Sequence, residues 1–225
     1  KDSLWIDKGV SNLGKQVIKE MNKWGMMIDV SHPSKQSIKD MISLSKAPII
    51  ASHSSARALC NHSRNLDDEQ LEWMKSNGGV VQTVAFSSYV SSEKHNAYST
   101  AISEKIENIA KERGMEMLSW DQIRKLEATD RETYVKEYRA MSKEATLMMN
   151  DSDPKPVDVA DFVDHIDYLI EKMGLDHVGI SSDFDGGGGI FGWNDASETL
   201  NVTAELVKRG YTEDEIEKLW SGNLL

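Results

Sequence analysis

Short apolar runs alternate with amphipathic segments along the first third of the chain. Residues 26–30 (MMIDV) and 47–51 (APIIA) are each too short for a helix, and their Ile and Val content is typical of buried strands. Between them, apolar residues recur at helical spacing after Ser34, which belongs to a favoured class of N-cap residue. The pattern therefore predicts a strand, a helix over residues 34–46 and a second strand.

The same alternation continues to the end of the chain. Further strands are predicted at residues 79–86 and 177–181, and further helices begin at Ser11, Asp67, Asp158, about Asp195 and Thr212. Strands that alternate with helices predict an α/β fold with a parallel sheet. Four strands are half of an eight-stranded barrel, so the chain is either a small open sheet or the C-terminal half of a (β/α)8 TIM barrel.

Residues 87–157 break this rhythm because they are polar, rich in charge and much longer than a connection between a strand and a helix requires. Helices are predicted within them at about residues 101–113 and 129–149. We expect residues 1–225 to form a single catalytic-domain fragment with a helical insertion at about 87–157, which folds over one edge of the core. A solvated helical excursion is an equally good interpretation.

Composition narrows the classes of partner. A net charge of −11 argues against nucleic acid and anionic membranes, and no run reaches the roughly 18 apolar residues that span a bilayer. Cys60 is the single cysteine, which excludes an internal disulfide. Because the chain begins at Lys1, without an initiator Met, we expect a fragment or a processed product. The sequence is compatible with a homodimer and identifies no compartment.

The candidate chemistry lies where the predicted strands end. His32 and His53 each follow a Ser directly after one of the first two strands. Parallel strands joined by a helix place their carboxyl ends at the same edge of a sheet, so the two imidazoles are expected to converge. A single histidine at such a position is more often structural, but imidazole is a good ligand for zinc. We interpret this pair as a metal site.

Two further residues complete the candidate set. Asp183 follows the last predicted strand and precedes the flexible loop Gly186–Gly189, where a carboxylate beside a metal can act as a ligand or as a base. An aspartate that forms a turn before glycines is the alternative interpretation. Arg64 lies in the loop after His53, and by itself it would be interpreted as a surface arginine.

Several spaced segments carry a resemblance to a known family. They are a Gly-x-x-Ile-Asp-x-Ser-His pattern at 25–32, PIIASHSSA at 48–56, Arg64-Asn65 followed by Asp68, GGVV at 78–81, HVGISSDFDGG at 177–187 and GNLL at 222–225. In this order they resemble the membrane (renal-type) dipeptidases and their bacterial relatives, a family of binuclear zinc peptidases on a barrel fold. Residues 87–157 are the least matched part.

The resemblance implies a zinc-dependent dipeptidase, in which a metal-bridging hydroxide attacks the peptide bond of a dipeptide. His32 and His53 match the histidines that bind the second zinc ion. Arg64 matches the arginine that holds the free carboxylate of the substrate. Asp183 matches the aspartate that contacts the bridging water and relays its proton, which makes it both catalytic and substrate-binding.

The other family residues have no counterpart in this chain. The early His-x-Asp pair, the bridging glutamate and the histidine for the substrate carbonyl belong to the first half of the barrel. We therefore expect this chain to lack the first metal and to be inactive by itself. Two other functions stay open: a metal-dependent hydrolase of another amide or a lactone on the same barrel, and a metal-free barrel relative that serves as a binding module.

Overall fold

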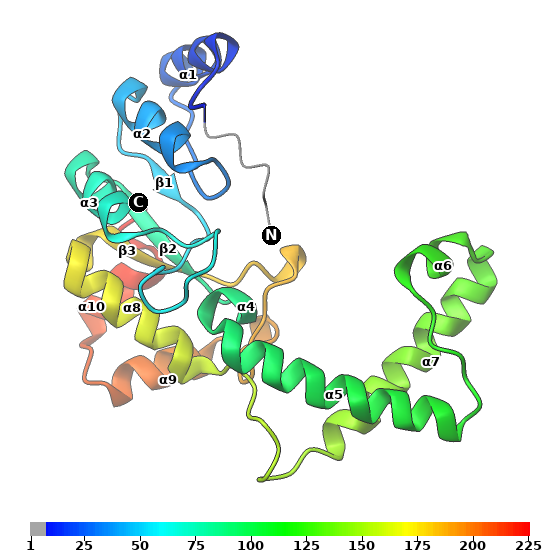
Figure 1. Cartoon of the computed structure of the whole chain (residues 1–225). Coiled ribbons are helices and arrows are strands. Elements are labelled where there is room, and N and C mark those ends of the chain that lie inside the picture. Colours follow the sequence, from blue (N-terminus) through cyan, green and yellow to red (C-terminus); the bar gives the residue numbers. More distant parts are fainter. Residues whose placement is uncertain (1–7) are drawn as a thin grey trace. The chain divides into compact units, whose positions relative to one another are not determined.

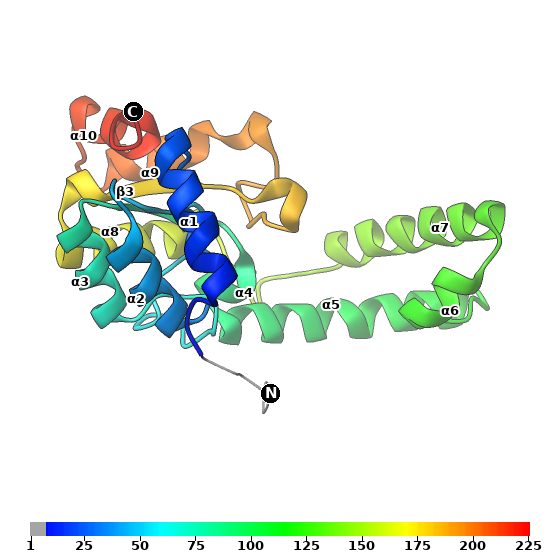
Figure 2. The same ribbon diagram turned by 90° about the horizontal axis from the view of Figure 1, so that it is seen from above.

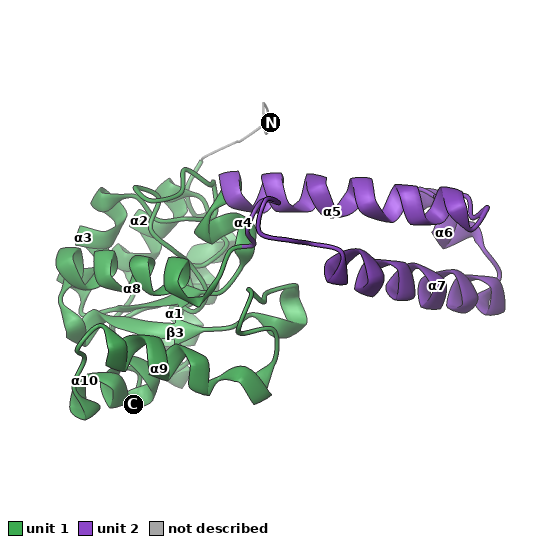
Figure 3. Ribbon diagram, turned by 90° about the horizontal axis from the view of Figure 1, so that it is seen from below, with its two compact units in different colours: residues 1–92, 157–225 green, residues 93–156 purple. Residues whose placement is uncertain are grey.

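The computed structural model describes residues 8–225, which form two compact units (Figure 3). The first unit contains the described residues up to Ser92 and residues Val157–Leu225. The second unit contains Glu93–Pro156. The expectation of one catalytic domain with an insertion at 87–157 stays a prediction.

A parallel sheet lies at the centre of the first unit. Its strands are β1 (Ile50–Ala51), β2 (Val80–Val84) and β3 (Val178–Ser181), in the order β1-β2-β3. Ile50 pairs with Val80, and Val81 pairs with Val178. These strands confirm three of the four predicted ones, within shorter bounds.

The first predicted strand, residues 26–30, is wrong as a full strand. Only Asp29 forms a bridge, with Ile50, although the amide of Val30 donates to the Ile50 carbonyl at 2.8 Å and the Ile50 amide donates to Ile28 at 3.0 Å. Met26 and Met27 are 59% and 56% exposed, so the apolar run that suggested a longer strand is only partly buried. Residues 28–30 therefore lie beside β1 at the edge of the sheet and pair with it in parallel over a single bridge. Within the described residues the sheet is open.

The main helices pack against one another in the order of the chain. Figures 1 and 2 show α1, α2 and α3 side by side. Helix α3 also packs against α8, and α8 packs against α9. Their bounds are α1 (Asn12–Trp24), α2 (Lys35–Leu44), α3 (Asp68–Asn77), α8 (Val159–Met173) and α9 (Leu200–Lys208). A short helix, α4 (Ser87–Val90), follows β2, and α10 (Glu213–Glu217) continues into a π-helical turn, Lys218–Gly222.

Helix caps confirm most predicted helix starts. The side chains of Ser11, Ser34, Asp67, Asp158 and Thr212 accept amide hydrogen bonds at the starts of their helices, which satisfies donors that would otherwise lack partners. The helix predicted from Asp195 begins instead at Leu200. The Asp195 carboxylate caps a separate 3-10 turn, Ala196–Glu198, so the cap was recognised but assigned to the wrong element.

The core lies where α8 meets the sheet. The side chains of Phe162, Val163, Ile166 and Leu169 on α8 are completely buried, as the spacing of apolar residues predicted. His165 is buried on the same helix and bridges the loop after β1 to the end of α4. The Ala56 amide donates to His165 Nδ1 at 3.1 Å, and Nε2 lies 2.9 Å from the Val90 carbonyl oxygen. This bonding pattern requires the neutral imidazole with the proton on Nε2.

The buried His165 is expected to make the fold sensitive to acid. Its burial lowers the pKa of its imidazole, so the unfolded chain binds a proton that the folded chain excludes. Stability is therefore present above the unfolded pKa of about 6.5 and decreases as the pH falls below it, by at most about 1.4 kcal/mol per pH unit for one proton. Urea unfolding between pH 8 and pH 5 measures this slope. In H165Q the slope should be shallower, and an unchanged slope would contradict this role.

The second unit has a small core of its own. Its helices are α5 (Ser92–Glu112), whose first residue belongs to the first unit, α6 (Trp120–Lys125) and α7 (Ala128–Leu147). α5 and α7 confirm the two predicted helices, whereas α6 was missed although Ser119 and Gln122 form a capping box at its start. Its buried side chains are Ile106, Ile109, Ala110, Met141 and Ala145. Across residues 8–225, none of the helices has the length and apolar character needed to span a bilayer.

Candidate functional site

The two strand-end histidines converge, as the sequence predicted. His32 follows the short pairing at residues 28–30, and His53 follows β1. Their Nε2 atoms lie 2.8 Å apart, and the ring centroids are 4.8 Å apart with the planes inclined at 60°. Parallel pairing of the two segments brings both imidazoles to the same edge of the sheet.

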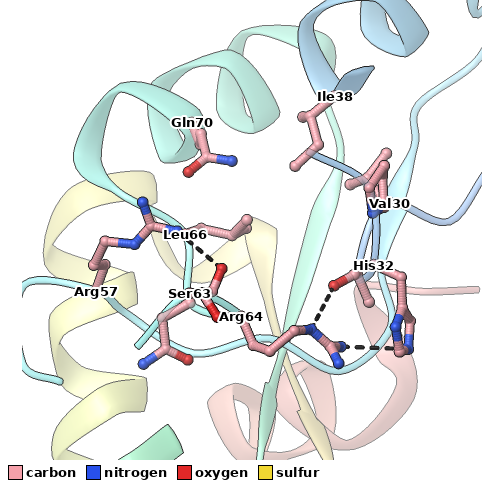
Figure 4. A pocket seen from close by; sticks show the side chains of 11 residues that line it. Val30, His32, Ile38, Arg57, Ser63, Arg64, Leu66 and Gln70 are labelled. Carbon is pink, nitrogen blue, oxygen red and sulfur yellow. Dashed lines mark hydrogen bonds between the residues drawn. The ribbon is translucent and has the colours of Figure 1, made fainter. Parts of the chain in front are cut away.

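Arg64 joins this pair from the loop that follows β1. A hydrogen bond closes this loop, because the Arg57 amide donates to the Leu66 carbonyl at 2.8 Å. Figure 4 shows the Arg64 side chain extended toward His32, with Nη2 3.3 Å from His32 Nε2 and Nε donating to the Ser31 carbonyl at 3.2 Å. The structure therefore places Arg64 beside the histidines, although position in the sequence alone favoured a surface role.

A stack of rings supports the arginine from the other side. Its guanidinium lies 5.5 Å from the ring centroid of Tyr89. Tyr89 in turn stacks between His62 and Phe86, at centroid distances of 4.3 Å to each. Contact with an aromatic face stabilises a guanidinium and fixes its plane. Tyr89 could not be predicted from the sequence, because it follows β2 and is distant from Arg64 along the chain.

The cavity beside Arg64 is small. It has a volume of about 30 Å³ and is lined by Val30, Ser31, His32, Pro33, Ile38, Arg57, Ser63, Arg64, Asn65, Leu66 and Gln70. Arg57 Nε and Asn65 Oδ1 are buried without a hydrogen-bond partner among the described residues. A space of this size accommodates about one water molecule and excludes a dipeptide. This cavity is therefore too small to be the pocket of such a ligand.

Asp183 occupies the end of β3 in an unusual conformation. Among the described residues it is the only one besides glycine with a positive φ, at 52°, which costs a non-glycine residue about 1–2 kcal/mol. The amides of Gly186 and Gly188 donate to its carbonyl oxygen at 3.0 and 2.7 Å. Phe184 packs edge-on against Trp193, with centroids 5.4 Å apart. Strain of this kind persists where the surroundings enforce it, often at functional positions.

The glycines after Asp183 are hydrogen-bonded to the surrounding backbone, and the expectation of a flexible loop stays a prediction. Besides the bonds to Asp183, the Gly189 amide donates to the Ala85 carbonyl at 2.7 Å. A Cβ on Gly188 would lie 2.0 Å from the Ser182 carbonyl oxygen. At this position glycine permits close packing of the backbone, which holds the end of β3 in place.

Charges around His32 favour its neutral form. Partial desolvation and the positive charges of Arg64 and His53 lower the pKa of the His32 imidazole. The carboxylates of Asp29 and Asp183 act in the opposite direction, which places both within electrostatic reach of His32. A neutral imidazole has a free lone pair on one ring nitrogen, and this is the form that binds a metal.

Sequence reasoning missed the carboxylate beneath the two histidines. Asp29 accepts hydrogen bonds from Ser31 and Ser52, which lie directly before His32 and His53. Desolvation opposes its ionisation, but these hydrogen bonds outweigh that effect and lower the pKa of the Asp29 carboxyl. The signal was the Asp-x-Ser-His spacing at residues 29–32, which served only to establish the resemblance.

The donor set fits half of a zinc site. Tetrahedral zinc places two nitrogen ligands at about 2.0–2.1 Å each, or roughly 3.3 Å from one another, so the His32 and His53 rings would separate only slightly. No group of three or more His, Cys, Asp or Glu side chains that could hold a metal occurs within residues 8–225. The chemistry of the two histidines fits zinc as a pair, which is fewer than the three protein ligands usual at a catalytic zinc.

The fold is of the α/β class, with polar side chains at the carboxyl ends of parallel strands, which is where enzymes of this class carry their sites. Residues 2–225 match the family model described as membrane dipeptidase, peptidase family M19. The chain belongs to this family.

Individual relatives agree with this assignment. A curated uncharacterized dipeptidase of Schizosaccharomyces pombe is 33% identical over 97% of this chain and 39% of its own length. The dipeptidase tcpJ of Claviceps purpurea is 26% identical over 100% of this chain and 41% of its own. The chain thus spans about two fifths of the length of these curated relatives.

Solved structures give the same picture. The probable dipeptidase PvdM of Pseudomonas aeruginosa superposes with a TM-score of 0.67 at 38% identity, covering 96% of this chain and 52% of that one. A metallopeptidase of Rhodobacter sphaeroides, bound to a phosphinate mimic of L-Ala-D-Ala, has a TM-score of 0.63 at 24% identity and covers 96% and 45%. The α/β fold therefore matches dipeptidase structures over about half of their length.

Proposed function

We propose that this chain supplies the C-terminal half of the (β/α)8 barrel of a zinc-dependent dipeptidase. Membership of the M19 family supports the reaction class. The observation that carries the assignment of the site is the approach of His32 Nε2 and His53 Nε2 to 2.8 Å beside Arg64. Two imidazoles that converge beside a guanidinium group suit a metal and an anionic substrate group together.

His32 and His53 would hold one zinc ion through Nε2. When bound, zinc supplies Lewis acidity, which activates water at neutral pH and stabilises the negative charge that develops on the substrate carbonyl. Partial desolvation and the charge of Arg64 lower the pKa of His32 and favour the neutral imidazole, which is the form that binds a metal. The pair by itself is incomplete, because a catalytic zinc has three protein ligands as a rule.

Arg64 would bind the free carboxylate of the dipeptide. A guanidinium group matches a carboxylate through two parallel hydrogen bonds. The bond from Nε to the Ser31 carbonyl and the contact with Tyr89 orient the plane of Arg64 in advance. Because the recognised group is the end of a peptide, this contact would restrict the substrate to very short peptides.

Asp183 would move a proton between the attacking water and the leaving amine. A carboxylate beside the reacting atoms can accept the proton of the nucleophile and return it to the departing nitrogen. Its left-handed backbone and the hydrogen-bonded glycines hold it at the end of β3. Its electrostatic effect on His32 supports a place within the same site.

The test of this proposal compares the 225-residue chain with the complete barrel, in which a first half supplies the remaining ligands. Zinc content and hydrolysis of L-Ala-L-Ala are measured before chelation, after it, and after zinc is restored. We expect two zinc ions and turnover in the complete barrel, loss of both on chelation, and recovery with zinc. The chain alone should be inactive. A complete barrel that binds no zinc and hydrolyses no dipeptide contradicts the proposal.

A further inference from the structure

One carboxylate joins the two strand ends that carry the histidines. Asp29 Oδ1 accepts hydrogen bonds from the Ser31 amide at 3.0 Å, the Ser31 hydroxyl at 2.8 Å and the Ser52 amide at 3.1 Å. Asp29 Oδ2 accepts the Ser52 hydroxyl at 2.5 Å. The two oxygens thus have different partners. Oδ1 accepts from two backbone N–H groups and the Ser31 hydroxyl, whereas Oδ2 accepts from the Ser52 hydroxyl.

The hydrogen bonds continue from the serines to His53. The Ser52 hydroxyl lies 2.8 Å from His53 Nδ1, and the His53 amide donates to Ser31 Oγ at 3.0 Å. A hydroxyl has a single proton. Because Ser52 donates its proton to Asp29, its oxygen can only accept at Nδ1, and the proton of that bond has to belong to His53.

We propose that Asp29, acting through Ser52, is a positioning residue that holds His53 as the Nδ1–H tautomer. In this tautomer the lone pair of His53 is on Nε2, which accepts the hydrogen bond from His32 Nε2 at 2.8 Å. Hydrogen bonding at one ring nitrogen determines which nitrogen is free to bind a metal. The inference rests on the proposed zinc site and adds the residues that orient one of its ligands.

The asymmetry of the carboxylate makes Asp29→Asn a sharp test. The NH2 group of the new asparagine cannot occupy the Oδ1 position, because two backbone N–H groups donate there and NH2 is not an acceptor. Its NH2 group has to occupy the Oδ2 position and donate to Ser52 Oγ. The Ser52 proton is then free to donate to His53 Nδ1, which moves the imidazole proton to Nε2. The shape of the site is retained while the direction of the hydrogen bonds is reversed.

The tautomer can be measured without metal by 15N NMR of histidine-labelled full chain at about pH 8, above the ordinary histidine pKa of about 6.5. In the unmodified protein, His53 should show a protonated Nδ1 and an unprotonated Nε2. D29N should shift the signals toward the Nε2–H form. The control is D195N, because Asp195 accepts the Ser197 amide and hydroxyl in the same pattern, at the start of the 3-10 turn Ala196–Glu198.

A second variant and a second readout complete the test. S52A removes the acceptor at Nδ1, and we expect it to abolish the tautomer preference, while S52T restores it. In the complete barrel, chelator competition should show zinc affinity lowered about 10–100-fold by D29N and S52A and unchanged by D195N. The same His53 tautomer in the unmodified protein and in D29N would overturn the inference. If the tautomer shifts but the zinc-loaded barrel hydrolyses no dipeptide, the proposed function fails instead.

Discussion

Replacing His53 by alanine is expected to abolish zinc-dependent dipeptide hydrolysis by the complete barrel. His53 Nε2 is one of the two nitrogen atoms that converge at the sheet edge, and its removal leaves a single imidazole there. Changes in the outer shell of a metal site cost about 10–100-fold in affinity or activity, so loss of a ligand should lower kcat/KM at least about 10³-fold. Zinc content should fall together with the activity.

The matched control removes a histidine from the other end of the sheet. His177 lies directly before β3, and its Nδ1 is 2.9 Å from the Gly79 carbonyl oxygen. H177N retains an N–H donor near this position, so zinc content and turnover should remain close to those of the unmodified protein. An H53A variant with full zinc content and full turnover would show that the two imidazoles are not the metal ligands.

Replacing Arg64 by alanine is expected to have the second largest effect, and only on substrates with a free carboxylate. Removing one partner of a hydrogen-bonded charge pair costs about 2–5 kcal/mol, so kcat/KM for L-Ala-L-Ala should fall by about 30- to 4,000-fold. The corresponding dipeptide amide lacks the negative charge, and its slower turnover should hardly change. R64K should recover only part of the loss, since an ammonium group cannot form the paired hydrogen bonds.

The control for this result is R124A. Arg124 lies in the second unit, and its side chain is 77% exposed. R124A should leave both substrates unaffected. Equal losses for the dipeptide and its amide in R64A would indicate that Arg64 supports the fold of the site and does not bind the substrate. No loss for either would favour the alternative of a hydrolase that acts on a neutral amide or a lactone.

Local signals in the sequence predicted most of the fold. Caps such as Asp67 and Asp158 determine where a helix begins through bonds to residues two or three positions later, so they can be recognised without the fold. Burial is harder to predict. Met26 and Met27 belong to an apolar run but are exposed, because only residues 28–30 of that run pair with β1. This is why the first strand is shorter than expected.

Some residues of the candidate site could likewise be predicted from the sequence, and others could not. His32 and His53 could be paired from the sequence because parallel strands bring equivalent ends together. The position of Arg64 depends on how a loop folds back, and only the family resemblance indicated it. Asp29 was missed because its role lies in the direction of hydrogen bonds to Ser52 and His53, which arises only after two separate segments have paired. The positive φ of Asp183 likewise depends on packing around the following glycines.

The central claim is that the sheet edge at His32 and His53 binds zinc. Anomalous diffraction at the zinc absorption edge, from crystals of the complete barrel grown with zinc, tests this claim most directly. We expect an anomalous peak within bonding distance of both His32 Nε2 and His53 Nε2. A zinc-containing, active protein whose anomalous peaks all lie away from these two nitrogens would contradict it.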